Sequence, residues 1–281
     1  MKNPHFGDLF LIKIRYMNTI KPILEGIYNN VEQRRTCIPL FRSSPGLGKT
    51  MLVHQFAKEK GVKLVTFIAS QRLPNEISGI ALPIQGKEEM SFFDFNTLLE
   101  MKDGDILFFD EVLNANPMVL NACLNLLEDR RTISGRKLAD IMIVAAGNPQ
   151  GATVMTPQQK ERFIFYDVSY NEKAWGNYMY DKYAAIPEEI ITQLSVLIKN
   201  ENFHNSTVNY FTPRSIDKAI GMMINETPTP YKSSLYPILS TTIENTLEDS
   251  ILPDGYEWKK NEKISWLNLQ KHLINDKANS K

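Results

Sequence analysis

A short glycine-rich loop constrains the fold of this chain more than any other feature of the sequence. The loop, Ser43–Thr50, reads SSPGLGKT and follows the apolar run Cys37–Phe41. After it, apolar residues recur at the spacing of one helical face: Leu52, Val53, Phe56 and Ala57. The pattern predicts a buried strand, a tight turn and a helix in succession. Pro39 counts against the strand, because proline cannot donate to a sheet ladder.

This strand–loop–helix order is suited to binding phosphate groups. Glycines let backbone N–H groups turn inward around phosphate oxygens, and a helix N-terminus adds partial positive charge. Lys49 is expected to reach the β- and γ-phosphates of a nucleotide, and Thr50 to hold Mg²⁺. The nucleotide-binding residues predicted for ATP are Ser44, Pro45, Gly46, Leu47, Gly48, Lys49, Thr50 and Met51.

The loop departs from the pattern G-x-x-x-x-G-K-[ST] at its first position, where this chain has Ser43. Serine there would cost roughly 1–2 kcal/mol if the backbone needed a positive φ. A residue that leaves a strand often does not need that conformation. Ser43 is nevertheless the sequence feature that favours an alternative function, a nucleotide-gated binding module with little turnover.

A second motif completes the predicted site about 60 residues further on. The apolar run Ile106–Phe109 ends in two carboxylates, Asp110 and Glu111. Asp110 is expected to ligate Mg²⁺ through water. Glu111 is expected to polarise the attacking water, a general-base role worth about 10²–10⁴-fold in rate. Because the two motifs occur together and in this order, they predict a nucleotide-hydrolysing site.

The rest of the first 170 residues alternates short buried strands with helices. Such alternation predicts an α/β domain, with a parallel sheet covered by helices on both faces. Further strands are expected at Lys63–Ala69, Asp105–Phe109, Ile141–Ala146 and Phe163–Val168, helices at Tyr16–Arg35, Phe92–Met101 and from Asn116 onward, and a hairpin at Arg131–Leu138.

After about Ser169 the strand-like runs stop and helical patterns dominate. These patterns are Pro187–Lys199, Ser215–Ile224, Tyr236–Ile251 and Ile264–Ile274. We therefore expect two domains. Residues 1–170 would form the nucleotide-binding α/β domain with an N-terminal helical lead-in, and residues 171–281 a smaller all-helical lid domain.

From about Thr36 to Ile220 the chain resembles the AAA+ ATPases, and within them the MoxR-like branch. Five segments carry the resemblance, together with the stretch Gln71–Gly79. The glycine-rich loop looks like the Walker A motif and Leu107–Glu111 like Walker B. Ala145–Pro149 is similar to the sensor 1 segment, and Glu161–Phe163 to the segment that carries the arginine finger. Phe211–Ser215 is similar to the start of the sensor 2 helix.

The resemblance implies a P-loop (AAA+) fold and roles for three more residues. Asn148 would position the lytic water beside Glu111. Arg162 would be the arginine finger, although Arg130 or Arg131 could serve instead, and a finger is worth about 10³–10⁵ in rate. Arg214, on the lid, would contact phosphate and couple nucleotide state to domain angle. If the finger comes from a neighbouring subunit, hydrolysis requires a homo-oligomeric ring, which the resemblance implies is a hexamer.

Composition gives no argument for a nucleic-acid or membrane partner. Lys plus Arg equals Asp plus Glu, so the formal net charge is zero, and phosphate-backbone binding needs clustered positive charge. A loader or motor that acts on nucleic acid remains the alternative within the same fold. The resemblance favours a protein client, with a von Willebrand A-domain protein as one candidate partner.

A cytoplasmic location is expected, and the two cysteines, Cys37 and Cys123, lie in apolar runs typical of small buried residues.

Overall fold

The computed structural model describes residues 20–93, 96–132, 134–182, 188–199 and 212–224. The chain divides into two compact units. One comprises the described residues up to Ser169, and the other begins at Tyr170. The first unit contains the glycine-rich loop and is described first.

A five-stranded parallel sheet forms the centre of the first unit, as the alternating pattern predicts. Its strand order is β2-β5-β6-β1-β7, and every pair of neighbours is parallel. All five carboxyl ends therefore lie along one edge of the sheet. The strands, in that order, are Leu64–Ile68, Ile106–Asp110, Met142–Gly147, Pro39–Arg42 and Ile164–Asp167.

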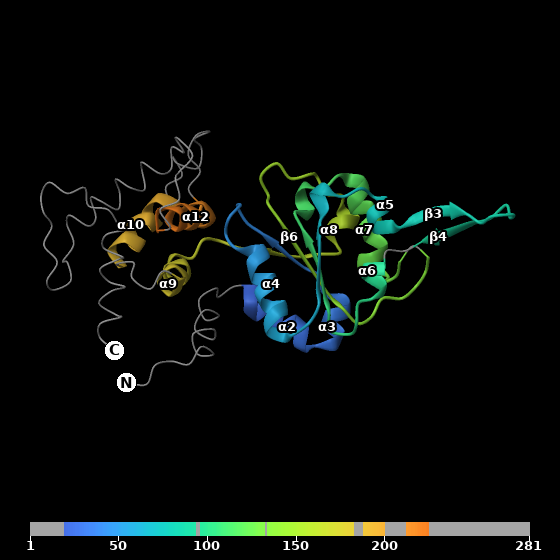
Figure 1. The fold of residues 1–281 in the computed structure, drawn as a ribbon, viewed down its shortest axis with the longest axis horizontal. Coiled ribbons are helices and arrows are strands. Elements are labelled where there is room, and N and C mark those ends of the chain that lie inside the picture. The colour runs from blue at the N-terminus through green and yellow to red at the C-terminus, as the bar shows by residue number, and fades with distance from the viewer. Residues whose placement is uncertain (1–19, 94–95, 133, 183–187, 200–211, 225–281) are drawn as a thin grey trace, which may run out of the picture. The chain divides into compact units, whose positions relative to one another are not determined.

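Helices cover both faces of this sheet, which explains why its central strands read as continuous apolar runs. On one face, α7 (Pro117–Glu128) packs with alternate strand residues such as Leu107 and Phe109 in one buried cluster. The intervening strand residues point to the other face, where α2 (Ile20–Asn29) and α4 (Lys49–Lys60) contact each other and α4 contacts β5. The two layers of helices are visible in Figure 1.

Strand β1 accommodates Pro39 because that residue is the first of the strand, a position where proline is tolerated. The ladder to β7 begins one residue earlier, where the Ile164 N–H donates to the Ile38 carbonyl. Pro39 therefore removes no hydrogen bond between β1 and β7.

Two expected helices are wrong in part. The described portion of Tyr16–Arg35 contains two helices, because the backbone of Asn30 is extended and its side chain accepts from the Gln33 N–H at the start of α3 (Val31–Thr36). Residues 16–19 lie outside the described part of the chain. The expected helix Phe92–Met101 is reduced to α6 (Asn96–Leu99), because Met90–Phe93 forms strand β4.

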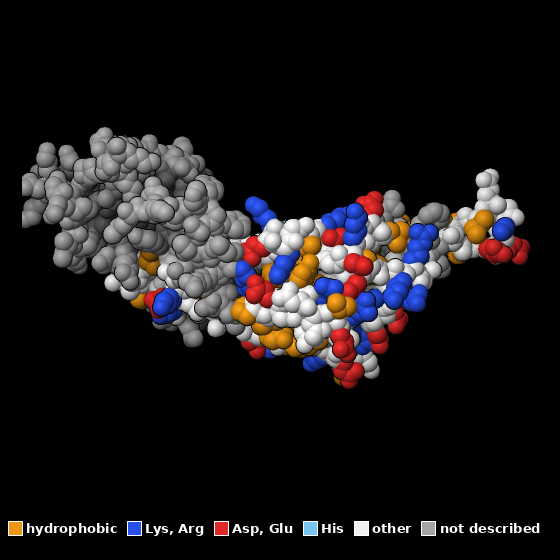
Figure 2. Space-filling view, turned by 90° about the horizontal axis from the view of Figure 1, so that it is seen from below, with side chains coloured by type: hydrophobic (Ala, Val, Ile, Leu, Met, Phe, Trp, Pro, Cys, Tyr) orange, Lys and Arg blue, Asp and Glu red, His pale blue; other side chains and the backbone are white. Residues whose placement is uncertain are grey.

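Strand β4 pairs antiparallel with β3 (Ile80–Pro83), and this hairpin projects from the α/β unit (Figure 1). Ile80, Leu82 and Met90 are exposed on it. Its turn includes Gly86 with a φ of 80° and ends in acidic residues. In Figure 2 the end of the hairpin carries hydrophobic, basic and acidic side chains together. Short elements precede it, a 3-10 helix η1 (Ala69–Gln71) and α5 (Asn75–Ser78).

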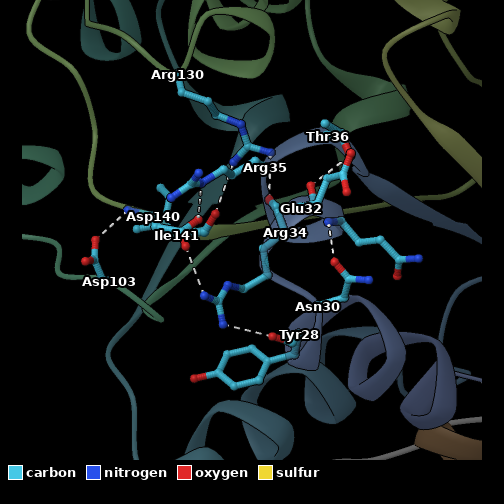
Figure 3. Close-up of polar contacts among 11 residues, drawn as sticks. Tyr28, Asn30, Glu32, Arg34, Arg35, Thr36, Asp103, Arg130, Asp140 and Ile141 are labelled. Carbon is cyan, nitrogen blue, oxygen red and sulfur yellow. Dashed lines mark hydrogen bonds and ion pairs between the residues drawn. The ribbon is translucent and has the colours of Figure 1, made fainter.

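A polar cluster at the amino edge of the sheet joins α3 to the start of β6 (Figure 3). Asp140 accepts from Arg34 at 2.9 Å and from Arg35 at 3.3 Å. Arg130 donates to the carbonyls of Ile141 and Arg34 at 3.2 and 3.0 Å. The cluster is a structural link, since Asp140 and Arg130 bond to residues of α3 that are 96 to 106 positions away in the chain.

The described part of the second unit consists of α9 (Glu172–Lys182), α10 (Glu188–Lys199) and α12 (Pro213–Ile224). Asp217 of α12 pairs with Lys182 of α9 at 2.7 Å. The expected helices at 236–251 and 264–274 lie outside the described residues. Within the described residues, no helix has the length and apolar character needed to cross a bilayer.

Candidate functional site

The glycine-rich loop connects the carboxyl end of β1 to the amino end of α4. Gly46 and Gly48 have φ angles of 80° and 84°, in the left-handed region that glycine adopts without steric cost. Gly48 is the N-cap of α4, and its carbonyl accepts from the Leu52 N–H. The loop therefore has the backbone conformation that its glycines predict, with a helix N-terminus directly behind it.

Ser43 does not carry the steric cost considered from the sequence. Of the described non-glycine residues, only Glu111 and Arg130 have a positive φ. Ser43 is 5% exposed, and its N–H donates to the Gly147 carbonyl of β6 at 3.3 Å. The first loop position thus continues the sheet and needs no glycine.

Lys49 is buried, and its ammonium lies against the start of its own loop. Nζ donates to the Ser43 carbonyl at 2.9 Å, to Ser43 Oγ at 2.6 Å and to the Ser44 carbonyl at 3.3 Å. Within the loop Ser44 is exposed, while Pro45 through Gly48 and Thr50 are half-buried. Met51, in the first turn of α4, is also exposed.

The second predicted motif meets the loop at this edge of the sheet. Thr50 Oγ1 donates to Asp110 Oδ2 at 2.6 Å, and the other carboxylate oxygen of Asp110 accepts from the Glu111 N–H at 2.9 Å. A hydroxyl and a carboxylate side by side are oxygen ligands of the kind that Mg²⁺ takes together with phosphates. The structure therefore brings together the two residues predicted to hold the metal.

Glu111 has a backbone conformation that is unusual for its residue type. Its φ is 56° and its ψ is 28°, and it caps the 3-10 helix η2 (Val112–Asn114). The left-handed region costs a non-glycine residue roughly 1–2 kcal/mol. Its side chain accepts a short hydrogen bond from Ser70 Oγ. Strain of this kind concentrates at functional sites, and here it falls on the predicted general base.

Asn148 follows β6 at the same edge. Its side-chain oxygen accepts from the Gln150 N–H at 3.0 Å, which directs the amide group of Asn148 to serve as a donor. Gly147, directly before it, packs tightly against η2. A Cβ on Gly147 would lie 2.5 Å from Leu113 Cγ. Only glycine therefore lets β6 and the segment after Glu111 approach this closely.

The three arginines considered as fingers differ in their surroundings. Arg162 donates to Glu128 at the end of α7 and to the Gln158 carbonyl, and 20% of its side chain is exposed. Arg130 belongs to the buried cluster of Figure 3, and burial lowers the pKa of its guanidinium to about 10, while Asp140 raises it. Arg131 is exposed and donates to the Gly135 carbonyl at 2.8 Å, across the predicted turn, where Arg131 and Lys137 form an antiparallel bridge.

Arg214 lies on the second unit, in the first turn of α12. Thr212 caps this helix by accepting from the Ser215 N–H at 3.1 Å, and the Arg214 side chain is exposed. The helix begins at Pro213, two residues before the expected start at Ser215. The role of Arg214 toward phosphate stays a prediction.

Two residues of the site were not found from the sequence. Ser70 follows β2, and Ile68 pairs with Asp110 in the register of β2 and β5, so Ser70 and Glu111 emerge side by side. A polar residue at the carboxyl end of a predicted strand was the available signal for Ser70. Gly147 could have been singled out as a glycine ending an otherwise bulky buried strand.

Comparison with known proteins agrees with this geometry. Residues 44–163 match the family model of the AAA domain (dynein-related subfamily). The uncharacterized protein MJ0079 of Methanocaldococcus jannaschii is 27% identical over 132 residues, which are 46% of this chain and 33% of that protein. The uncharacterized protein YeaC of Bacillus subtilis is 30% identical over 135 residues, 45% of this chain and 40% of that protein. The chain thus spans well under half the length of these relatives.

Solved structures share the fold at low sequence identity. The Thermotoga maritima RuvB Holliday junction branch migration motor is 18% identical, with a TM-score of 0.53 over 80% of this chain and 67% of that one. The Saccharomyces cerevisiae Hsp104:casein complex is 15% identical, with a TM-score of 0.54 over 80% of this chain and 48% of that one. Residues 44–163 therefore match an AAA domain in sequence, and the chain shares the P-loop fold of AAA+ proteins.

Proposed function

We propose that this chain is an ATPase that binds ATP with Mg²⁺ at the Ser44–Met51 loop and hydrolyses it. The observation that carries the proposal is the 2.6 Å hydrogen bond from Thr50 Oγ1 to Asp110 Oδ2. It joins the phosphate-binding loop to the acidic end of β5, and a metal–nucleotide site needs both.

The residues of the loop and of the end of β5 suit a bound nucleotide with Mg²⁺. The positive φ angles of Gly46 and Gly48 suit a loop whose N–H groups face phosphate oxygens, and α4 begins directly behind it. Thr50 and Asp110 would hold Mg²⁺, which usually binds through one or two carboxylates plus substrate phosphates. When bound, the ion would neutralise charge on the phosphates. Lys49 would add a second positive charge beside it.

Glu111 and Asn148 would act on the attacking water. Glu111 would accept its proton, and the amide group of Asn148 would donate to the water or to the γ-phosphate. Support comes from their shared location, because β5 and β6 are neighbouring parallel strands that end at the same edge.

Steady-state phosphate release tests this proposal. Lys49→Ala and Glu111→Gln should each lower kcat by at least about a hundredfold. Glu88→Gln, which removes a carboxylate from the exposed hairpin turn, is the matched control and should leave the rate unchanged. Equal phosphate release from all four proteins would reject the proposal. Nucleotide binding by the wild type without any turnover would favour the nucleotide-gated module instead.

Arg162 is the proposed arginine finger, acting on the site of a neighbouring copy in a homo-oligomer, with a hexamer as the expected state. Its guanidinium is half-buried and held by an acidic residue on the surface, whereas that of Arg130 is committed to two backbone carbonyls within its own subunit.

Mixed assemblies test the finger. Arg162→Ala and Glu111→Gln should each be inactive alone, because each lacks one component. A mixture should regain activity, since a Glu111→Gln subunit supplies Arg162 to a neighbour whose own Glu111 is intact. Light scattering with and without ATP gives the oligomeric state. No gain on mixing, together with a monomer under both conditions, would contradict the finger and the ring.

We further propose a MoxR-like function, in which lid movement in the ring remodels a protein partner, with a von Willebrand A-domain protein as a candidate. A protein client is supported by the zero net charge and by the interspersed acidic and basic side chains on the face shown in Figure 2. Arg214→Ala should uncouple hydrolysis from client remodelling. DNA that stimulates phosphate release at low but not at high salt would point to nucleic acid instead.

A further inference from the structure

We propose that the Ser43 hydroxyl is a positioning group that competes with nucleotide phosphates for the Lys49 ammonium, so that it weakens nucleotide binding and speeds nucleotide release. This inference rests on the proposed nucleotide binding at the same loop. It assigns a function to the one loop position that departs from the expected pattern.

Oxygens of its own loop surround the ammonium of the lysine. An ammonium group has three N–H donors. Lys49 Nζ lies within hydrogen-bond distance of three loop oxygens, namely the Ser43 carbonyl, Ser43 Oγ and the Ser44 carbonyl at 2.9, 2.6 and 3.3 Å. For Lys49 to bind phosphate oxygens, at least one of these contacts has to be exchanged.

The hydroxyl differs from the two carbonyls in being specific to this sequence. A loop with glycine at position 43 would keep both carbonyl acceptors and lose Oγ. The contact to Oγ is also the shortest of the three, which is typical of a hydrogen bond with a charged donor. Since hydrogen bonds to charged groups are stronger than neutral ones, Ser43 Oγ adds a real competitor to the phosphate.

The hydroxyl is also held in place for this contact. Its own hydrogen is donated to the Ser44 carbonyl at 2.9 Å, which leaves the lone pairs of Oγ for Lys49. The Ser43 backbone is fixed by its N–H bond to the Gly147 carbonyl. With only 5% of Ser43 exposed, water competes little for this oxygen.

Removal of the hydroxyl should therefore favour the nucleotide. Ser43→Ala removes one buried oxygen, and Ser43→Gly removes the same oxygen while restoring the usual residue. Both should bind ATP and ADP about tenfold more tightly, with most of the change in the dissociation rate. Agreement between the two variants would assign the effect to the hydroxyl, since alanine and glycine differ in backbone freedom.

The experiment is titration and stopped-flow displacement of fluorescent N-methylanthraniloyl-ATP and -ADP with Mg²⁺, on the full chain. Ser91→Ala is the matched control, because it removes a hydroxyl from strand β4, outside the glycine-rich loop. Ser43→Ala is also measured on the Lys49→Ala background, where its effect should vanish, because the competition requires the ammonium. A purely structural role for Ser43 would persist on that background.

The outcomes separate this inference from the proposed function. A wild type that binds neither nucleotide overturns both. A wild type that binds, with Ser43→Ala equal or weaker, overturns the inference alone, as does an effect that survives Lys49→Ala. Tighter binding by both Ser43 variants, abolished by Lys49→Ala, supports it.

Discussion

Thr50 Oγ1 and Asp110 Oδ2 are 2.6 Å apart, although the two residues are separated by 60 positions in the chain. The contact follows from the topology. Helix α4 begins after β1 but packs over β5, which lies two places away in the order β2-β5-β6-β1-β7. The first turn of α4 therefore reaches the carboxyl end of β5, and two polar side chains meet where a metal–phosphate group would need them.

Replacing Thr50 should change the Mg²⁺ requirement before it changes anything else. Thr50→Val keeps the shape of the side chain and removes the oxygen, so we expect half-maximal phosphate release to need about tenfold more Mg²⁺. Thr50→Ser keeps the oxygen and should remain close to the wild type. The measurement is the rate of ATP hydrolysis against Mg²⁺ concentration. Identical curves for the valine and serine variants would contradict the metal role.

Ser70 should restrain the general base. Its hydroxyl donates to the Glu111 carboxylate, and this hydrogen bond has to loosen before the same oxygen can turn to the attacking water. We expect Ser70→Ala to raise basal kcat about threefold, because hydrogen bonds of this kind contribute on the order of 1 kcal/mol. The check is steady-state ATPase activity, with Ser91→Ala on β4 as the control. A fall in kcat would mean that Ser70 positions Glu111 productively.

Much of this architecture was predictable, and what was missed has a physical cause. Parallel strands covered on both faces must be apolar throughout, so Ile106–Phe109 was identifiable from composition alone. The β3–β4 hairpin was not, because the short apolar run at its second strand fits a helix or a strand equally well until its pairing with Ile80–Pro83 is known.

The contact between Ser70 and Glu111, like the hairpin, could not be predicted without knowing which strands pair. It depends on which strands are neighbours and on their register, with Ile68 opposite Asp110. The motifs and their spacing identify the loop and the acidic pair, but they do not give the order of the strands in the sheet. The residues proposed to face the nucleotide were therefore accessible from the sequence, and the residues proposed to position them were not.

Gly147→Ala should destabilise the first unit. The added Cβ would lie 2.5 Å from Leu113 Cγ and 2.8 Å from Leu113 Cβ, so η2 has to shift. Overpacking of this kind typically costs about 1–3 kcal/mol, and we expect a loss in that range in the free energy of unfolding, measured with urea. Because η2 follows Glu111, phosphate release should fall as well.

Two further variants make this prediction specific. Gly26→Ala lies inside α2, where an added Cβ meets nothing within 4 Å, so it should be neutral or stabilise by up to about 1 kcal/mol. Leu113→Ala on the Gly147→Ala background removes Leu113 Cγ and Cδ1 but keeps Cβ, so it should recover only part of the lost activity. A Gly147→Ala protein with wild-type stability would show that the close approach is not required.

Cys123 should report on the integrity of α7 through its reactivity. Burial raises the pKa of its thiol to about 12 from an ordinary value of 9.0, and the thiolate is the reactive form. In native protein at pH 8, iodoacetamide should therefore modify the half-buried Cys37 well before Cys123. In urea both should react at similar rates. Peptide mass spectrometry measures the two rates separately, and equal rates in the native protein would contradict the burial of Cys123.

The same pKa difference predicts a loss of stability at alkaline pH. The folded chain keeps the Cys123 thiol protonated while the unfolded chain ionises it, so the contribution is complete below about pH 9 and is lost between about pH 9 and 12. Each unit of pH in this window should lower the free energy of unfolding by about 1 kcal/mol from this group. Urea unfolding from pH 8 to pH 10.5 measures the slope. Cys123→Ala should be less stable at pH 8 because it leaves a cavity, but its stability should fall less steeply with pH, and a slope equal to that of the wild type would assign the alkaline loss to other groups.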